Sequence, residues 1–317
     1  MKTYATIITT DDYLLGALAL HKSLMMTSPR HDLLVLLTIS ISVGSRRILD
    51  RQGVRTLTLD REFNMPEKAK ATNTRSGMSH WNHTLSKLLI FDLTQYEKIV
   101  FLDADMMVLQ NLDHLFKLPH MSALVADKLC HEHWVQLNAG LMVIEPQSGL
   151  AASIVSHASA LERTGECFGM EPLLHAQYPD WPERPELHLN QKYNVFFSSI
   201  ERYVNRYGYN VNWTCPDDKT IAVLHFIGLE KPWSLSRIRQ LKRVLREISR
   251  FNLVSTKALC RYFLIINSVR NGEHAFRDKV FSCVLNLLGN LHDNLTRLRG
   301  ELPIIDRLTQ LTRANWS

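Results

Sequence analysis

The chain has 317 residues, of which 45% are apolar and 21% are charged, so its composition is that of an ordinary globular protein. Its five cysteines are odd in number and none has Cys-x-x-Cys spacing, which favours a reduced, intracellular protein over a disulfide framework. No uninterrupted apolar stretch approaches the roughly 20 residues of a membrane span. The first residues run straight into an apolar segment and not into a signal peptide, so we expect a cytoplasmic protein.

The net charge of +6 is unevenly distributed. Residues 231–317 hold 16 Lys or Arg and six Asp or Glu, a net charge of +10, whereas residues 1–230 hold 21 and 25, a net charge of −4. The basic character therefore belongs to the tail, and the body needs no nucleic acid partner to explain it.

Strand-like and helix-like patterns alternate through residues 1–145. The expected strands are 3–8, 32–38, 55–59, 98–102, 122–126 and 137–144, and the expected helices are 14–26, 45–52 and 81–93. This alternation predicts an α/β fold with a mostly parallel, twisted sheet and helices on both faces.

The remainder is less regular at first and then helical. We expect helices and loops of an acceptor side over 146–220, a last apolar strand at 221–226, and amphipathic helices from Leu235 onward. The chain is thus divided into a domain at 1–235 and a basic helical region at 236–317. No Gly-x-Gly-x-x-Gly follows the first strand and no P-loop occurs, which argues against a nicotinamide dehydrogenase or a P-loop kinase.

Asp103-Ala104-Asp105 follows the apolar run 99–102, where a buried strand should end. In open α/β sheets, ligands bind beyond the carboxyl ends of the strands. Two carboxylates at alternate positions can converge on a hard divalent cation such as Mn²⁺ or Mg²⁺, and such a cation can hold a diphosphate. The alternative is a surface turn after a strand, because Asp-x-Asp alone is a common sequence.

Five short segments occur in a specific order over residues 3–235. They are Thr6-Ile7-Ile8-Thr9-Thr10-Asp11-Asp12-Tyr13, Leu85-Ser86-Lys87-Leu88, Phe101-Leu102-Asp103-Ala104-Asp105, Asn138-Ala139-Gly140, and His225-Phe226-Ile227-Gly228 followed by Lys231-Pro232-Trp233. Each is weak alone, but together they resemble glycosyltransferase family 8. This group of retaining enzymes includes glycogenin, galactinol synthase and bacterial lipopolysaccharide galactosyltransferases, and its glycogenin-like members resemble the chain most.

The resemblance implies a nucleotide-diphospho-sugar transferase (GT-A) fold with a helical C-terminal appendage, and it assigns roles to individual residues. Asp103 and Asp105 would hold the cation with His225 as third ligand, and this mixed oxygen and nitrogen set suits Mn²⁺. The implied donor-binding residues are Thr9, Asp11, Tyr13, Ala104, Gly228 and Lys231. The implied catalytic residues are Lys87, Asp127, Asn138 and Glu171.

Several of these residues also have ordinary structural interpretations. His225 could be a satisfied core histidine, and Tyr13 could be a core aromatic residue at the start of a helix. Asp11 could cap the next helix. Lys87 and Lys231 could be solvated surface lysines.

One segment departs from the family pattern. The family carries Asp-Gln on the helix after the Asn-x-Gly strand, and the best register places Met170 and Glu171 there. A thioether cannot hydrogen-bond a sugar hydroxyl as a carboxylate does. Glu171 could take over the positioning of the sugar or act as a nucleophile in a double displacement, and Glu166 is the candidate if the register differs.

From the resemblance we predict a Mn²⁺-dependent transfer of a hexose, with retention, from UDP-glucose or UDP-galactose to a hydroxyl of a glycan, lipid-linked or small-molecule acceptor. Self-glucosylation of a tyrosine is a further alternative. Two rivals are a non-catalytic UDP-sugar-binding protein and a nucleotidyltransferase, although the latter would want a glycine- and basic-rich loop after the first strand. The basic tail has three interpretations: peripheral contact with the inner face of a membrane, packing on the body, or a homodimer contact.

Overall fold

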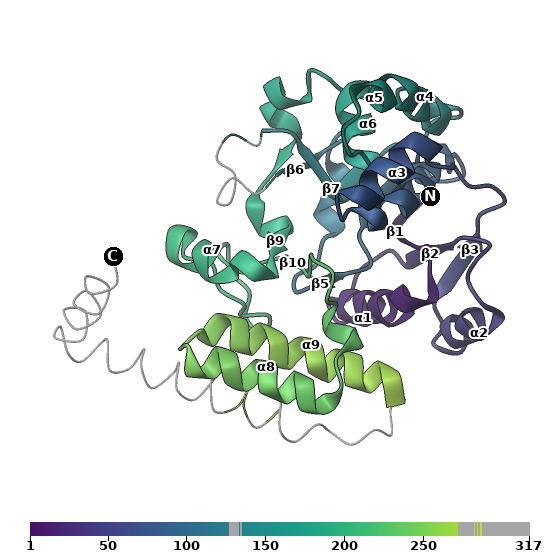
Figure 1. The fold of residues 1–317 in the computed structure, drawn as a ribbon. Helices are drawn as coiled ribbons and strands as arrows, with labels where there is room; N and C mark the ends of the chain where they lie inside the picture. Colours follow the sequence, from purple (N-terminus) through teal and green to yellow (C-terminus); the bar gives the residue numbers. More distant parts are fainter. Residues whose placement is uncertain (127–132, 134, 272–281, 283, 285, 287–317) are drawn as a thin grey trace. The chain divides into compact units, whose positions relative to one another are not determined.

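The computed structural model describes residues 1–126, 133 and 135–271, with three further positions at 282, 284 and 286. The chain forms two compact units, Met1–Leu235 and Ser236–Ser317. The first unit contains the strands and most of the helices, and the second begins with two helices (Figure 1).

A seven-stranded sheet with the order β3-β2-β1-β4-β7-β6-β8 is the centre of the first unit. Its pairs are parallel except for β4-β7 and β6-β7, so the expected mostly parallel α/β sheet is confirmed. The strands are β1 (Lys2–Ile8), β2 (Leu33–Leu37), β3 (Arg55–Thr58), β4 (Lys98–Leu102), β6 (Ala123–Val125), β7 (Leu137–Ile144) and β8 (His188–Leu189).

Helices cover both faces of this sheet because its central strands are apolar on both sides. All five residues of β2 are buried, as are all eight of β7. On one face α1 packs against β1 and β2, and on the other α4 and α6 pack together with a 3₁₀ segment. The helices of this unit are α1 (Leu14–Met25), α2 (Val43–Arg51), α3 (Glu67–Arg75), α4 (Leu150–Ser156), α5 (Ala158–Thr164), α6 (Met170–Gln177) and α7 (Ile200–Tyr207).

A second, three-stranded sheet has the order β5-β10-β9 and joins segments that are distant in sequence. It comprises β5 (Met106–Val108), β9 (Val195–Phe196) and β10 (Val223–His225). The antiparallel register of β10 and β5 pairs His225 with Met106, the residue that follows Asp105. Pairing within this small sheet therefore places His225 beside Asp105.

The structure differs from the sequence-based expectation in several elements, among them the short strands β8 and β9 within 146–220, where only helices and loops are expected. The segment 81–93 is 3₁₀-helical over Ser79–Asp92, and both α3 and β5 were missed. α3 was missed because its nine residues are mostly polar, with only Ala69 and Asn73 buried. The three buried residues of β5 follow the second aspartate too closely to give a periodic signal of their own.

Short 3₁₀ turns connect many of these elements. They lie at Asp11–Tyr13, Asp113–Lys117, Trp181–Glu183, Pro185–Leu187, Gln191–Tyr193, Phe197–Ser199 and Pro232–Ser234.

The second unit begins with α8 (Arg237–Ser249) and α9 (Leu253–Asn271). The Ser236 side chain caps α8 by accepting a hydrogen bond from the backbone N–H of Arg239. Between the helices the buried amide of Asn267 donates to Oε1 of Gln240 at 3.1 Å. Among the residues that the structure describes, no helix combines the length and apolarity needed to cross a membrane.

Candidate active site

The two aspartates leave the sheet at the end of β4, beside the beginning of β7. Because β4 and β7 are antiparallel, the carboxyl end of one meets the amino end of the other, and the backbone N–H of Asp103 donates to the Gly140 carbonyl at 2.9 Å. The carbonyl of Asp105 accepts the backbone N–H of Phe226 at 2.9 Å, which fixes the loop against β10. Side chains of β4, β7 and β10 therefore share one site.

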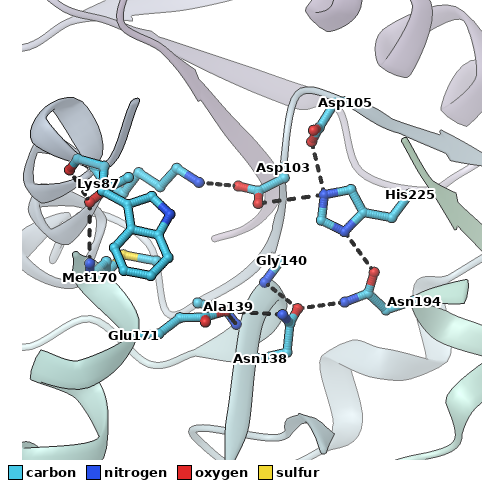
Figure 2. Close-up of polar contacts among 12 residues, drawn as sticks. Lys87, Asp103, Asp105, Asn138, Ala139, Gly140, Met170, Glu171, Asn194 and His225 are labelled. Carbon is cyan, nitrogen blue, oxygen red and sulfur yellow. Dashed lines mark hydrogen bonds and ion pairs between the residues drawn. The ribbon is translucent and has the colours of Figure 1, made fainter. Parts of the chain in front are cut away.

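His225 completes a group of three metal-ligating side chains with Asp103 and Asp105. Its Nε2 lies 3.0 Å from Oδ1 of Asp105 and 3.9 Å from Oδ2 of Asp103. One potential ligand atom from each of the three lies within 4.8 Å of the others. Asp105 and His225 are buried, and Figure 2 shows both aspartates on the side of the ring that carries Nε2.

These three side chains fit a divalent cation. Adjacent ligands in an octahedral shell with bonds of about 2.1 Å are separated by about 3 Å, and the separation of His225 Nε2 from the Asp105 carboxylate is 3.0 Å. Oxygen and imidazole ligands together suit Mn²⁺, while oxygen ligands alone are more typical of Mg²⁺. Asp103, Asp105 and His225 would therefore be the protein ligands of such a cation.

Each aspartate is also paired with a lysine. Lys87 Nζ lies 2.5 Å from Oδ1 of Asp103, and Lys231 Nζ lies 2.6 Å from Oδ2 of Asp105. Burial alone would raise the pKa of Asp105, but His225 and Lys231 outweigh it and hold this pKa well below its ordinary value. Burial would lower the pKa of Lys87, but Asp103 reverses this and the pKa is raised. Both groups are therefore charged at neutral pH.

A chain of amides extends from the histidine to a third carboxylate. Nδ1 of His225 lies 2.9 Å from Oδ1 of Asn194, whose Nδ2 donates to Oδ1 of Asn138 at 2.6 Å. Nδ2 of Asn138 donates to Oε1 of Glu171 at 3.0 Å, and the Ala139 N–H donates to the same oxygen at 2.9 Å. Figure 2 shows this chain along one side of the site, opposite Lys87 and Asp103.

The sequence profile of Glycosyl transferase family 8 matches residues 5–236 of this chain. The chain belongs to glycosyltransferase family 8. The family is the one that the five segments resemble, and the match ends one residue after the first compact unit.

Three relatives illustrate the range of family 8 proteins to which the chain is similar. Inositol phosphorylceramide glucuronosyltransferase 1 of Arabidopsis thaliana is 29% identical over 73% of this chain and 42% of its own length. UDP-glucuronate:xylan alpha-glucuronosyltransferase 1 of the same plant is 30% identical over 73% of this chain and 32% of its own length. Glycogenin-1 of Oryctolagus cuniculus is 30% identical over 78% and 69%. The chain thus spans less than half the length of these two plant relatives.

Solved structures place the fold in the GT-A type of this family. The galactosyltransferase LgtC, solved in complex with donor and acceptor sugar analogs, has a TM-score of 0.54 and 14% identity, covering 88% of this chain and all of that chain. The predicted GT-A fold is confirmed.

Glu171, the sequence-based candidate for positioning the sugar or acting as a nucleophile, lies in the first turn of α6. Burial raises the pKa of its carboxyl group, and the negative charge of Asp103 raises it further. The positive charge of Lys87 opposes this shift but does not cancel it. The side chain of Met170 belongs to the hydrophobic core cluster and is 4% exposed. Glu166, the alternative candidate, is exposed.

Three candidate donor-binding residues, Thr9, Asp11 and Tyr13, follow β1, and their contacts in the structure differ. The Tyr13 ring packs edge-on against Trp233 with centroids 5.4 Å apart, and Lys231 Nζ lies 5.8 Å from the centre of the same ring. Asp11 accepts a hydrogen bond from the backbone N–H of Ser42, at the start of α2 and not of the next helix. The carbonyl of Thr9 accepts the hydroxyl of Ser40 at 2.9 Å.

The remaining candidate residues are Ala104, Gly228 and Asp127. Ala104 lies against α1, because a Cβ added to Gly16 would come within 2.8 Å of its carbonyl oxygen. Gly228 has φ of +102°, which glycine adopts readily and other residues do not, so this backbone conformation explains the glycine. Asp127 lies outside the described residues.

Sequence analysis missed Asn194, which links His225 to Asn138. It lies one residue before the two-residue strand β9 and is buried, with 1% exposure. Its local sequence gives no periodic or motif signal that would single out this asparagine.

Proposed function

We propose that the chain is a retaining hexosyltransferase that moves a hexose from UDP-glucose or UDP-galactose to an acceptor hydroxyl, with Mn²⁺ in the Asp103, Asp105 and His225 site. The observation that carries this proposal is the convergence of these three ligands with a lysine on each carboxylate. Family membership and the GT-A fold support a nucleotide-sugar donor.

The charged side chains account for departure of the diphosphate. Asp103, Asp105 and His225 would hold a divalent cation, and such a cation would supply Lewis-acid neutralisation of negative charge on the diphosphate. Lys231 immediately precedes the Pro232–Ser234 turn and reaches Asp105, where its ammonium adds a fixed positive charge for a phosphate oxygen. Lys87 provides a second positive charge from the opposite side of Asp103.

Glu171 and Asn138 lie across the site from Lys87 and Asp103 (Figure 2), on the side where we propose that the donor sugar binds. Asn138 donates to Glu171 and is itself held by the Gly140 N–H, so both side chains are fixed before a sugar arrives. We propose that Glu171 accepts hydrogen bonds from the donor hydroxyls and orients the anomeric carbon. This role needs the ionised carboxylate, which accepts and does not donate.

The acceptor class is proposed from the relatives. Their names include a polysaccharide, xylan, and a lipid, inositol phosphorylceramide. We propose a glycan or lipid-linked acceptor for this chain. The same names include UDP-glucuronate as a donor, so it belongs in any donor screen.

A donor screen tests the proposed function. UDP release is measured from UDP-glucose, UDP-galactose and UDP-glucuronate with Mn²⁺, before and after EDTA, and product NMR reports the anomeric configuration. We expect EDTA-sensitive release from a UDP-hexose and a retained configuration. Metal-independent turnover would contradict the proposal, and Mn²⁺-dependent UDP binding without any release would favour a non-catalytic binding protein.

A second proposal concerns the basic region. α8 exposes apolar side chains beside basic ones, with Ile238 70% exposed next to Arg239, and Phe251 just beyond the helix 87% exposed next to Arg250. We propose that this region contacts an anionic membrane surface, where each basic residue adds about 1 kcal/mol. Co-sedimentation of the full chain with anionic vesicles at low and high salt tests this, and a chain that stays in the supernatant at low salt would contradict it.

A further inference from the structure

Asn194 connects the metal-ligating histidine to the sugar side of the site. It lies just before β9 of the small sheet. Its Oδ1 is within hydrogen-bond distance of Nδ1 of His225, and its Nδ2 donates a hydrogen bond to Oδ1 of Asn138. Both of its polar atoms are engaged, and its side chain is buried. A buried amide engaged at both ends can adopt only one of its two flipped orientations.

The backbone N–H of Gly140 decides the orientation of the two side-chain amides, Asn138 and Asn194, that link His225 to Glu171. The N–H of Gly140 can only donate, and it lies 3.0 Å from the Asn138 side chain, so the atom facing it is the acceptor Oδ1. Nδ2 of Asn138 must then face Glu171, where a carboxylate accepts it.

The same logic continues to the histidine. The Asn194 atom 2.6 Å from Oδ1 of Asn138 has to be the donor Nδ2. Oδ1 of Asn194 is left facing Nδ1 of His225, and because an amide oxygen cannot donate, this ring nitrogen carries the proton.

We propose that Asn194 is a positioning residue that holds His225 as the Nδ1–H tautomer, leaving the Nε2 lone pair directed at Asp103 and Asp105 for a divalent cation. This inference rests on the proposed function. A metal-ligating histidine requires an unprotonated nitrogen toward the metal, and a hydrogen bond from the other ring N–H fixes both the tautomer and the ring plane.

Packing around the ring agrees with this role. Phe196, two residues after Asn194, packs edge-on against the His225 ring with centroids 5.6 Å apart. A Cβ added to Gly140 would lie 2.9 Å from Cε1 of the ring, so the glycine that supplies the deciding N–H also leaves room for the imidazole. β9, with the Asn194 that precedes it, and Gly140 therefore determine both the position of the His225 ring and which of its nitrogens carries the proton.

Two substitutions at Asn194 distinguish its effect on the His225 tautomer from its effect on packing. Asn194→Leu has a similar shape and removes the acceptor for Nδ1–H, whereas Asn194→Asp keeps an acceptor and removes the donor to Asn138. Asn73→Leu is the matched control, because Asn73 is also a fully buried asparagine but it bonds Asn82 and the Phe168 carbonyl instead of the site.

The first readout is independent of activity. With ¹⁵N-histidine labelling of the full chain at pH 9 in saturating Mg²⁺, a diamagnetic divalent cation that would separate Nε2 from the Asp105 carboxylate 3.0 Å away, we expect a protonated Nδ1 and an unprotonated Nε2 for His225; the pH lies above the ordinary imidazole pKa of about 6.5. The Asn194→Asp and Asn73→Leu variants should keep this pattern, and Asn194→Leu should lose it. An Nε2–H tautomer in the unsubstituted protein would overturn the proposal.

The second readout is Mn²⁺ affinity, measured by electron paramagnetic resonance. Asn194→Leu should weaken Mn²⁺ binding by about 10- to 100-fold, while Asn194→Asp and Asn73→Leu should bind Mn²⁺ as the unsubstituted protein does. Unchanged affinity in Asn194→Leu would overturn the proposal. If the unsubstituted protein binds Mn²⁺ with the expected tautomer but releases UDP from no donor, the proposed function fails and the role of Asn194 stands.

Discussion

Lys231 donates a hydrogen bond of 2.6 Å from Nζ to Oδ2 of Asp105, which precedes it by 126 residues. The lysine also donates to the Phe226 carbonyl at 3.1 Å, so its ammonium is held on the carboxylate by two acceptors. The side chains are 13% and 10% exposed, and a charge pair this shielded is screened less by salt than a surface pair. A positive charge is therefore in place beside the proposed cation site.

Replacing Lys231 should separate catalysis from metal binding. In Lys231→Ala we expect kcat/KM for the UDP-sugar to fall by about 100-fold, the order of losing one transition-state charge donor. Mn²⁺ affinity should not fall, because the ammonium shares Asp105 with the cation and its removal frees that oxygen. Steady-state kinetics and Mn²⁺ titration check this, and a parallel loss of Mn²⁺ affinity would contradict it.

Asp105→Asn should weaken metal and UDP binding together. The amide keeps the size of the side chain but removes the charge that His225 and Lys231 hold ionised. We expect a loss of Mn²⁺ affinity of at least about 100-fold, beyond the range seen for residues behind the ligands, by calorimetry. Asp113→Asn is the control, because that carboxylate bonds the Tyr4 hydroxyl and the Arg30 N–H and should leave Mn²⁺ affinity unchanged.

Glu171→Gln should give the opposite pattern. The amide oxygen can still accept from Asn138 and Ala139, so the fold of the site is kept, but the carboxylate proposed to face the sugar is gone. We expect transfer to fall by about 100-fold with UDP and Mn²⁺ affinities nearly unchanged. Loss of UDP binding equal to that of Asp105→Asn would show that Glu171 is structural.

The same variant should change the pH dependence of stability. A carboxyl whose pKa is raised by folding binds its proton more tightly in the folded state, so the folded protein loses stability as pH rises from the ordinary Glu value of 4.5 through the raised pKa. In EDTA, Glu171→Gln should therefore have a higher Tm than the unsubstituted protein at pH 7, by about 2–4 °C per kcal/mol. Thermal unfolding from pH 4 to 8 tests this; a gap that does not shrink toward pH 4 would contradict it.

Gly140→Ala should disturb the site through contact alone. The added Cβ would lie 2.9 Å from Cε1 of His225 and 2.9 Å from Cε of Met106, so the ring has to move. Overpacking of this kind costs about 1–3 kcal/mol of stability, and we expect Mn²⁺ affinity to fall with it. Gly44→Ala is the control: Gly44 lies in α2, the added Cβ would be 3.7 Å from the hydroxyl of Ser42, which caps this helix, and the Tm should rise slightly.

Much of the first unit follows from patterns short enough to read in the sequence. The strands around Thr3, Leu34 and Val100 are rich in apolar residues and buried on both faces, and such short runs are typical of buried parallel strands. Both aspartates were placed correctly at the end of β4 because the strand before them is so clear. α3 was missed because most of its surface is polar and shows no strong stripe.

The sequence by itself determined most strands of residues 1–145, the aspartates at a strand end and the family motifs, because each depends on residues near one another along the chain. Only the tertiary structure decided that β10 would pair with β5 and bring His225 to Asp105, and that Asn194 would link this ring to Asn138 and Glu171. Contacts between side chains 31 and 120 positions apart leave no local period. The direction of the hydrogen bonds from Asn138 to Asn194 and His225 is set by the backbone N–H of Gly140, and a backbone donor is the same in every residue but proline.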